Sequence, residues 1–225
     1  LAGLSYKTTL AEYVSLLDKP LMGIMGRDDL GRTSYVRYLL KKLADAETDN
    51  PSRLYVIDGA AGSLSECSAY GNTAQYSANA SDAVQIIATL YEEAQKRAEL
   101  MAEDAGALSK YPLLTAVFNT AVVIELIKGN EETFAQYQKL ITTYKRCRIC
   151  LIFTEIDNVG VTIVSNPIMK NLRDCGNLLI FENLGDIKII NVPMAAIRSV
   201  KKQSVSGDAC YISGNSMMRI KAPLL

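Results

Sequence analysis

The sequence contains no histidine among its 225 residues. This absence excludes Ser-His-Asp triads, Cys-His dyads and every metal site that needs an imidazole ligand. Long apolar runs are also missing, because the longest candidate, residues 113–124, is interrupted by Thr115, Asn119 and Thr120. A helix that crosses a bilayer needs about 18–20 consecutive apolar residues. The sequence therefore predicts neither a transmembrane segment nor a signal peptide.

The chain also lacks an excess of charge of one sign, since 24 Lys and Arg residues balance 24 Asp and Glu residues. A global basic field that could hold a nucleic-acid backbone is absent, so we expect no nucleic-acid partner. The apolar fraction of 49% and the charged fraction of 21% are those of a globular protein. One hydrophobic core can support a chain of this length, so we predict a single domain over residues 1–225. Because the chain begins with Leu1 and not with Met, we expect a fragment of a longer protein.

The five cysteines are scattered and odd in number, which is not the pattern of a secreted disulfide framework. Cys147 and Cys150 form a C-x-x-C pair, which occurs in zinc half-sites and in redox motifs. No second pair stands at ligand spacing in the sequence, and the pair runs directly into an apolar strand predicted at 149–153. We therefore favour reduced cysteines on a strand, a reducing cytoplasm and no metal site.

Apolar runs alternate with helical patterns along the chain. The runs predict strands at 21–25, 54–57, 113–118, 149–153, 178–181, 187–190 and 207–212. Helical spacing predicts helices at 36–43, 82–101, 130–144 and 167–174 and a turn of helix at 217–220, while the small, polar residues 60–80 predict a loop with at most a short helix. Wholly apolar strands that alternate with helices indicate a three-layer α/β fold, with a mostly parallel sheet covered by helices on both faces.

The segment between the first strand and the first helix is similar to a phosphate-binding loop. Such loops have the pattern G-x-x-x-x-G-K-[ST]; their backbone N–H groups and the helix N-terminus hold phosphates, and the Lys reaches the terminal phosphates. Gly26 and Gly31 have the required spacing, and Thr33 supplies the hydroxyl that binds magnesium. The alternative is an ordinary turn between a strand and a helix. The candidate nucleotide-binding residues are Gly26, Arg27, Asp28, Asp29, Leu30, Gly31, Arg32, Thr33 and Ser34.

Three features of this loop disfavour phosphate. Arg32 stands at the position of the Lys, and its planar guanidinium is larger than an ammonium. Asp28 and Asp29 place two carboxylates on a loop that would have to surround polyanionic phosphates. Each close contact between anions costs about 1–4 kcal/mol at about 4 Å. The side chain of Asp29 also adds bulk where nucleotide-binding loops often have glycine.

The second half of a nucleotide site is a strand that ends in Asp, often followed by a residue that orients the attacking water. The third predicted strand is instead followed by Asn119 and Thr120; the first is neutral and cannot offset the charge of magnesium, and the second cannot act as a base. Glu125 lies further along and is expected on an exposed helix face. Thr154 and Glu155 follow the next strand and could line a pocket at the strand ends, although an exposed loop explains them equally well.

Several segments, in this order along the chain, resemble one family. They are P-L-M-G-I-M-G at 20–26 with G-R-T-S at 31–34, L-Y-V-I-D-G at 54–59 with G-S-L at 62–64, R-A-E-L at 97–100, and G-D-A-C-Y-I-S-G at 207–214. Over the whole chain this order resembles FtsK/SpoIIIE-type P-loop ATPases. It is most similar to the C-terminal ATPase module of the type VII secretion ATPases of the EssC and EccC family. The resemblance implies a P-loop NTPase-like fold.

The resemblance also implies ligands and partners. ATP and magnesium are the ligands of the active modules in this family. The implied partners are secreted WXG100-type small helical proteins, other type VII substrates and the other ATPase modules of the same chain. The implied place is the cytoplasmic face of the cell membrane of a Gram-positive bacterium, with the membrane reached only through an upstream part.

We therefore expect a degenerate FtsK/SpoIIIE-type domain that recognises or docks secreted proteins. The alternative is an active ATP-hydrolysing motor for protein export, in which Arg32 replaces the Lys and Glu155 or Glu125 supplies the acid. A DNA-translocating module is disfavoured by the balanced charge. An apolar groove would be needed for a partner helix, and Tyr211, Met217 and Met218 are candidate contributors, with core packing as the favoured alternative for each.

Overall fold

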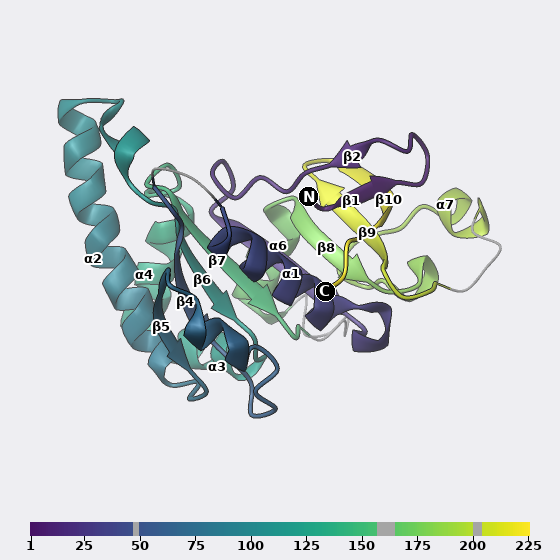
Figure 1. Ribbon diagram of the computed structural model, residues 1–225, viewed down its shortest axis with the longest axis horizontal. Helices are drawn as coiled ribbons and strands as arrows, with labels where there is room; N and C mark the ends of the chain where they lie inside the picture. The colour runs from purple at the N-terminus through teal and green to yellow at the C-terminus, as the bar shows by residue number, and fades with distance from the viewer. Residues whose placement is uncertain (47–49, 157–164, 200–203) are drawn as a thin grey trace. The chain divides into compact units, whose positions relative to one another are not determined.

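The computed structural model describes residues 1–46, 50–156, 165–199 and 204–225. These residues belong to two compact units (Figure 1). Unit 1 comprises Leu1–Ser15, Met22–Leu39 and Glu155–Leu225, and unit 2 comprises Leu16–Leu21 and Leu40–Thr154. Unit 1 therefore combines segments from both ends of the given sequence, whereas unit 2 is one long segment joined by a short one that precedes it.

The described strands of unit 2 are all parallel and follow the order β7-β6-β4-β5. They are β4 (Arg53–Ile57), β5 (Thr73–Ser77), β6 (Leu114–Phe118) and β7 (Ile149–Thr154). β6 and β7 are buried along their whole length, as expected for apolar strands of a sheet that is covered on both faces. Because the strands run in one direction, the residues that follow Ile57 and Phe118 emerge with the end of β7 at the same edge of the sheet.

The helices of unit 2 pack against one another, and α2 also contacts β4 and β6. They are α2 (Asp82–Glu103), α3 (Val122–Gly129) and α4 (Glu131–Ile141), with the short 3-10 helices η2 (Ser65–Ala69) and η3 (Ala107–Lys110) between the strands. α4 begins after Asn130, whose side chain accepts a hydrogen bond from the backbone N–H of Thr133 at 2.9 Å. The buried Arg97 of α2 donates to the carbonyl oxygens of Pro112 and Cys147, which precede β6 and β7. This side chain thereby fixes α2 to the amino ends of two strands.

The sheet of unit 1 is mixed, with the order β2-β1-β10-β9-β8-β3. β3 and β8 are parallel, and the other described pairs are antiparallel. The strands are β1 (Gly3–Ser5), β2 (Ala11–Glu12), β3 (Leu21–Gly26), β8 (Asn177–Phe181), β9 (Asp208–Ser213) and β10 (Ser216–Lys221). The helical segments are η1 (Asp28–Leu30), the first part of α1 (Arg32–Ala44), α6 (Pro167–Asp174), η4 (Leu184–Asp186) and α7 (Met194–Ser199).

The predicted α/β class, with a mostly parallel sheet and packed helices, is confirmed. The prediction of a strand at 187–190 is wrong: this segment buries Ile187 and Ile189 while Lys188 faces solvent, but it joins no ladder. The turn of helix predicted at 217–220 is also wrong, because these residues belong to β10, which pairs with β9 across a tight turn at Gly214. The loop predicted at 60–80 contains β5, and the strands β1 and β2 were not predicted.

The prediction that the C-x-x-C cysteines lie on a strand is met by Cys150 alone, because Cys147 precedes β7. Cys147 and Cys150 are both buried and free, and the second lies on β7. Among the described helices, none combines the length and the apolar character needed to span a membrane.

Candidate functional site

The phosphate-loop segment joins β3 to α1 in unit 1 through the short 3-10 helix η1. Two of its glycines are required by the backbone. Gly26 has φ +100°, and a Cβ at this position would lie 2.3 Å from the carbonyl oxygen of Phe181. Gly31 has φ +102°, which also lies in the left-handed region that only glycine adopts readily. The two glycines therefore fix the same strand-turn-helix path that the sequence pattern predicts.

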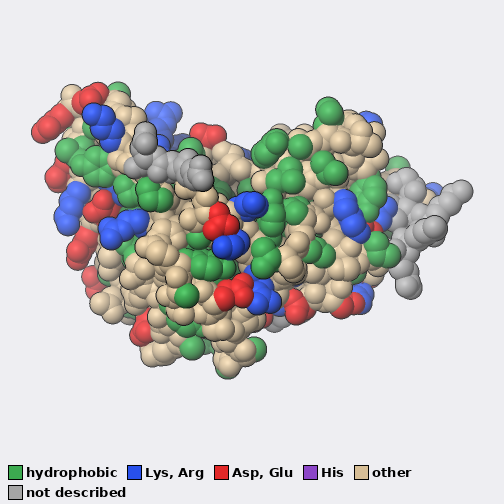
Figure 2. Space-filling view, viewed as in Figure 1, with side chains coloured by type: hydrophobic (Ala, Val, Ile, Leu, Met, Phe, Trp, Pro, Cys, Tyr) green, Lys and Arg blue, Asp and Glu red, His purple; other side chains and the backbone are tan. Residues whose placement is uncertain are grey.

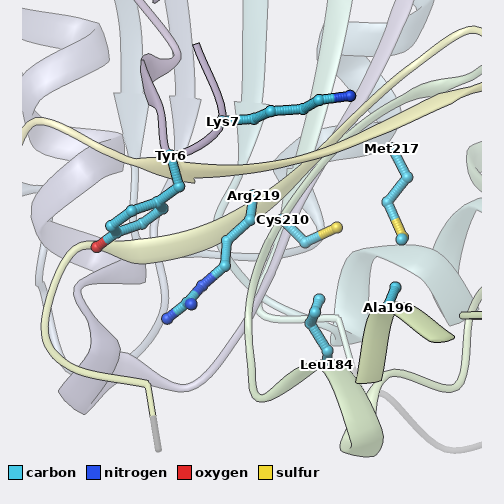
Figure 3. A pocket seen from close by; sticks show the side chains of 7 residues that line it. All are labelled: Tyr6, Lys7, Leu184, Ala196, Cys210, Met217 and Arg219. Atoms are coloured by element: carbon cyan, nitrogen blue, oxygen red, sulfur yellow. The ribbon is translucent and has the colours of Figure 1, made fainter. Parts of the chain in front are cut away.

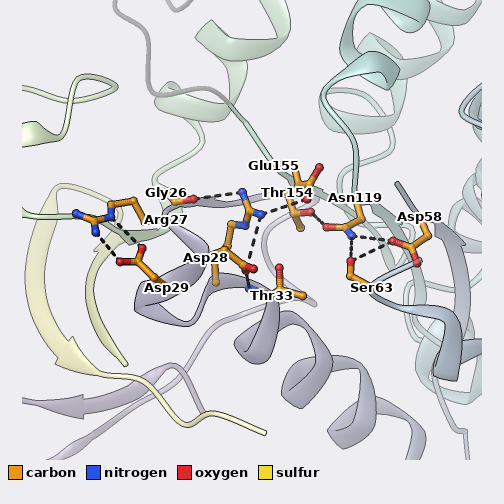
Figure 4. A network of polar contacts seen from close by, with 11 residues as sticks. Gly26, Arg27, Asp28, Asp29, Thr33, Asp58, Ser63, Asn119, Thr154 and Glu155 are labelled. Atoms are coloured by element: carbon orange, nitrogen blue, oxygen red, sulfur yellow. Dashed lines mark hydrogen bonds and ion pairs between the residues drawn. The ribbon is translucent and has the colours of Figure 1, made fainter. Parts of the chain in front are cut away.

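The carboxylate of Asp28 lies at the N-terminus of α1. Its Oδ1 accepts a hydrogen bond from the backbone N–H of Thr33 at 3.1 Å (Figure 4). The first N–H groups of a helix have no partner within the helix, and together with the helix dipole they favour an anion. In a phosphate-binding loop this place belongs to phosphate. Here an anion supplied by the loop itself occupies it.

Arg32, at the lysine position, folds back onto its own loop. Its Nη1 donates to the carbonyl oxygen of Gly26 at 3.2 Å, and its Nη2 donates to Oε1 of Glu155 at 3.2 Å. The same Nη2 lies 3.9 Å from Oδ1 of Asp28, and the side chain is only 14% exposed. The guanidinium therefore has two carboxylates of the same unit as neighbours, where a lysine would have a phosphate.

Asp29, the second carboxylate of the loop, points away from this cluster. It accepts hydrogen bonds from Nε and Nη2 of Arg27 in a bidentate pair, the first at 2.9 Å (Figure 4). The hydrogen bond from Arg27 holds the pKa of Asp29 below its usual value. Both side chains are about half exposed, so the pair contributes little to stability. The two loop carboxylates thus have different partners, and only Asp28 blocks the helix N-terminus.

The C-terminal residues of the chain also lie against the loop. The backbone N–H of Gly207 donates to the carbonyl oxygen of Leu30 at 2.7 Å. A Cβ on Gly31 would lie 2.6 Å from Cδ2 of Leu224, and the hydroxyl of Ser34 donates to the carbonyl oxygen of Leu225 at 2.8 Å. This contact was not predicted, since nothing in the local sequence connects segments almost 200 positions apart.

A second polar cluster lies at the carboxyl ends of the strands of unit 2. Asn119 follows β6 and is 1% exposed; its Nδ2 donates to Oδ1 of Asp58 at 2.8 Å and to Oγ of Ser63 at 3.0 Å (Figure 4). The hydroxyl of Thr154, at the end of β7, donates to Oδ1 of Asn119. The side-chain oxygen and nitrogen of Asn119 therefore both have protein partners.

Asp58 is the buried carboxylate of this cluster, at the end of β4. It accepts hydrogen bonds from the backbone N–H groups of Gly59 at 2.8 Å and Leu64 at 2.7 Å, and from the hydroxyl of Tyr76 at 3.0 Å. Burial, together with the hydrogen bond to Asp58, raises the pKa of Tyr76 to about 12. Tyr76 therefore stays protonated and keeps donating at neutral pH.

The structure separates the candidate residues into two groups. The loop residues 26–34 and Glu155 belong to unit 1, whereas Asn119, Thr120 and Thr154 belong to unit 2. Thr120 enters the turn into α3, where its carbonyl oxygen accepts from the backbone N–H of Val123 at 3.3 Å.

Some site residues were predicted and others were not. Glu125 lies on an exposed face of α3, as predicted, and it also forms an ion pair with Lys128. Asp58 was included only in the segment 54–59 that carries the family resemblance, with no role in a site, and Tyr76 was not predicted at all. The sequence signal for Asp58 was an acidic residue directly after an apolar strand. Ligand-binding residues of open α/β sheets stand at this position, beyond the carboxyl ends of the strands.

The residues do not fit a bound magnesium–triphosphate. An anion already lies at the N-terminus of α1, and the oxygen of Asn119 accepts from Thr154. Among the described residues, no group of three or more Cys, Asp and Glu side chains is arranged to hold a metal ion. A phosphate at the N-terminus of α1 would have to displace Asp28 from the backbone N–H of Thr33.

Comparison with solved structures identifies the fold, whereas sequence comparison does not. No protein-family model matches the sequence, and no curated protein matches it by sequence. The cytoplasmic domain of the Thermomonospora curvata type VII secretion ATPase EccC matches with a TM-score of 0.74 and 15% identity, over 100% of this chain and 26% of that chain. The chain has the fold of a type VII secretion ATPase module.

Two further structures of type VII ATPases agree. Thermomonospora curvata EccC (ATPases 2 and 3) in complex with a signal sequence peptide matches with a TM-score of 0.74 and 14% identity, over 100% of this chain and 40% of that chain. EssC (ATPases 2 and 3) from Geobacillus thermodenitrificans matches with a TM-score of 0.72 and 12% identity, over 99% of this chain and 40% of that chain. This chain thus spans between about a quarter and two fifths of the length of these type VII structures.

Proposed function

We propose that this type VII-like module docks proteins destined for export, while its phosphate loop is occupied by its own side chains and hydrolyses ATP weakly or not at all. The observation that carries the proposal is the contact of Asp28 with the backbone N–H of Thr33, beside the Arg32–Glu155 pair. Asp28 and the two Nη atoms of Arg32 have partners within unit 1, although Nε of Arg32 is buried without one. An incoming triphosphate would have to compete with groups that are covalently part of the same loop.

The charges of the loop support weak nucleotide binding. A phosphate near α1 would lie close to the carboxylate of Asp28, and one contact between anions at about 4 Å costs about 1–4 kcal/mol. Each 1.4 kcal/mol is a factor of about ten in affinity. Arg32 would also have to leave Glu155 before it could contact phosphate. These costs act in the same direction.

The second cluster supports weak hydrolysis. Asn119 is neutral and cannot offset the charge of magnesium, and its oxygen could coordinate the ion only after giving up the hydrogen bond from Thr154. A water-orienting carboxylate is absent at the next position, which is Thr120. Phosphoryl transfer depends on positioning and charge stabilisation, and these positions supply neither.

The docking part of the proposal follows from the fold and the loop together. A module that keeps its fold but loses its phosphate chemistry retains a surface for binding partners. The likeness to EccC, for which a structure with a signal sequence peptide exists, supports a protein segment as that partner. We propose secreted WXG100-type helical proteins and other type VII substrates as partners, together with neighbouring ATPase modules of the parent chain. The proposed location is the cytoplasmic face of the cell membrane, and we expect no nucleic acid.

Calorimetry with ATP and magnesium tests the nucleotide part of the proposal. We expect a dissociation constant for ATP that is no lower than the millimolar range, and no ATP turnover. Submillimolar binding together with turnover that disappears in Arg32→Ala would contradict it and favour an active export motor. The matched control is Arg27→Ala, because this arginine pairs with Asp29 on the exposed side of the loop.

Biolayer interferometry with purified secreted helical hairpins tests the docking part. The folded chain is immobilised, and candidate hairpins from the same genome are passed over it. We expect saturable binding of at least one hairpin that is unchanged by ATP. Absence of binding by every hairpin, with circular dichroism that shows a folded chain, would contradict docking.

A further inference from the structure

A groove on unit 1 has no role in the phosphate loop. It has a volume of about 380 Å³ and is lined by Tyr6, Lys7, Leu184, Ala196, Cys210, Met217 and Arg219. In Figure 3 the side chains of Tyr6 and Arg219 lie on one side of the groove, Met217, Leu184 and Ala196 lie on the other, and Cys210 lies between them. Lys7 extends across the top of this view, away from the guanidinium of Arg219 and toward Met217, so the two basic side chains lie at different edges of the groove.

The floor of the groove is one face of the antiparallel strands β9 and β10. Met217 and Arg219 are two residues apart on β10, so their side chains lie on the same face, and Cys210 of β9 joins them because it is paired with Arg219. The same face continues to Leu4 of β1, which is opposite Lys221 and is 50% exposed. Figure 2 shows hydrophobic side chains gathered next to basic ones over this part of unit 1. The apolar surface thus extends beyond the cavity along the sheet.

The charges that line the groove are all positive. Lys7 and Arg219 line it, and none of the seven lining residues is acidic. In the described part of the chain, Lys7 forms no ion pair. Arg219 uses Nη2 for Asp208 at 2.8 Å, and its guanidinium carbon lies 4.7 Å from the ring centre of Tyr6.

Asp208, two residues before Cys210 on the same face of β9, is already paired with basic side chains. It accepts hydrogen bonds from Tyr6, Arg219 and Lys221 and from the backbone N–H of Val205. Burial acts to raise the pKa of Asp208, but the hydrogen bonds from Tyr6, Val205 and Arg219 outweigh it and hold that pKa below its usual value. Two cations thus face one carboxylate, and Lys7 adds a third, so the groove keeps an excess of positive charge.

We propose that this groove docks a peptide segment of a partner protein in which an Asp or Glu side chain stands next to a bulky apolar side chain. The carboxylate pairs with Lys7, Arg219 adds positive charge nearby, and the apolar side chain covers Met217, Leu184 and Ala196. The inference rests on the proposed docking function and assigns it a surface. Charge complementarity selects the acidic residue, and the extension of the apolar face to Leu4 favours a peptide over a small anion.

Panning a random peptide library on the full chain tests the proposal directly. Displayed 12-residue peptides are selected on the wild-type protein and on Lys7→Glu, and the enriched peptides are measured by fluorescence anisotropy. We expect wild-type selection to enrich peptides with an acidic residue within two positions of Leu, Ile, Phe or Met. Lys7→Glu should weaken these peptides by about tenfold, the effect of about 1.4 kcal/mol. Met217→Ser should weaken them as well.

The control is Lys170→Glu, which reverses an exposed lysine on α6, an element that does not line the groove. It should leave the affinity within twofold of wild type. Enrichment of peptides without acidic residues, no enrichment at all, or equal loss in Lys7→Glu and Lys170→Glu would overturn the proposal. The proposal would also be overturned, in favour of a small anion, if a fatty-acid carboxylate or a mononucleotide displaced the selected peptides and if the affinity of the peptides did not depend on their sequence.

The groove and the proposed function fail in distinguishable ways. If a secreted hairpin binds wild type and Lys7→Glu equally well, the docking function stands and the groove is wrong. If selected acidic peptides bind in the groove but no secreted hairpin does, the groove stands and the proposed function is wrong.

Discussion

The buried carboxylate of Asp58 offers the sharpest test of the second polar cluster. Its oxygens accept hydrogen bonds from two backbone N–H groups and from the side chains of Tyr76, Asn119 and, at 3.4 Å, Ser63. Asp58→Ala removes all these acceptors at once. The backbone N–H of Leu64 and one N–H of the Asn119 amide, whose other bond to Ser63 remains, are buried with almost no access to water, so they cannot find new partners without a rearrangement.

The expected loss follows from these two donors. An unsatisfied buried donor costs about 1–3 kcal/mol, so Asp58→Ala should lower the free energy of unfolding by about 4 kcal/mol. Asp58→Asn keeps one oxygen but turns an NH₂ group toward other donors, so it should cost about half as much. Urea unfolding followed by circular dichroism measures both changes.

The matched control for Asp58 is another aspartate of unit 2. Asp45 is 48% exposed and pairs with Lys41, so Asp45→Ala should change stability by less than about 0.5 kcal/mol. A loss in Asp58→Ala that stays within about 1 kcal/mol of wild type would refute the reasoning. It would mean that water or a local rearrangement satisfies the donors that Asp58 accepts from in the wild-type protein.

Three further predictions concern other parts of the chain. The pKa of Asp208 is lowered in the folded state, so its contribution to stability is present above its unfolded pKa of about 3.9 and is lost as the pH falls through the lower folded value. Asp208→Asn should therefore destabilise the protein at pH 7 and lose less stability than wild type on acidification. Urea midpoints measured between pH 2 and pH 7 will show both effects. Gly26→Ala should lower the melting temperature strongly, since φ is +100° and the new Cβ would meet a carbonyl at 2.3 Å, whereas Gly129→Ala, with nothing within 4 Å of its Cβ, should leave it unchanged or raise it slightly. Burial raises the pKa of the Cys210 thiol to about 12, so mass spectrometry after brief alkylation should find Cys175, which is only partly buried, modified before Cys210; the reverse order would contradict the burial of β9.

Much of the fold could be predicted from the sequence because three strands of unit 2, β4, β6 and β7, are short and mainly apolar and are separated by helical periods, whereas the polar strand β5 was missed. β6 and α2 follow this rule closely. The strands β1 and β2 were missed because they are only three and two residues long and depend on pairing with distant β10. The segment 187–190 shows the opposite error, in which apolar residues are buried without a strand partner.

The candidate site was predictable in composition but not in contacts. The pattern from Gly26 to Thr33 indicates a loop with misplaced carboxylates, yet nothing in it says which carboxylate reaches the helix. In the structure Asp28 accepts the hydrogen bond from the helix N-terminus, and Asp29 pairs with Arg27. The partner of Arg32 is Glu155, more than 120 positions away, and such long-range pairs leave no local signal.

The central claim is that the loop's own carboxylate takes the place of phosphate at the N-terminus of α1. Nuclear magnetic resonance of the Thr33 amide, titrated with ATP and magnesium, tests it most directly in wild type, Asp28→Ala and Asp29→Ala. We predict that the Thr33 resonance stays in place at millimolar nucleotide in wild type and in Asp29→Ala, and shifts on titration only in Asp28→Ala. A saturable, submillimolar shift of Thr33 in the wild-type protein would contradict the claim.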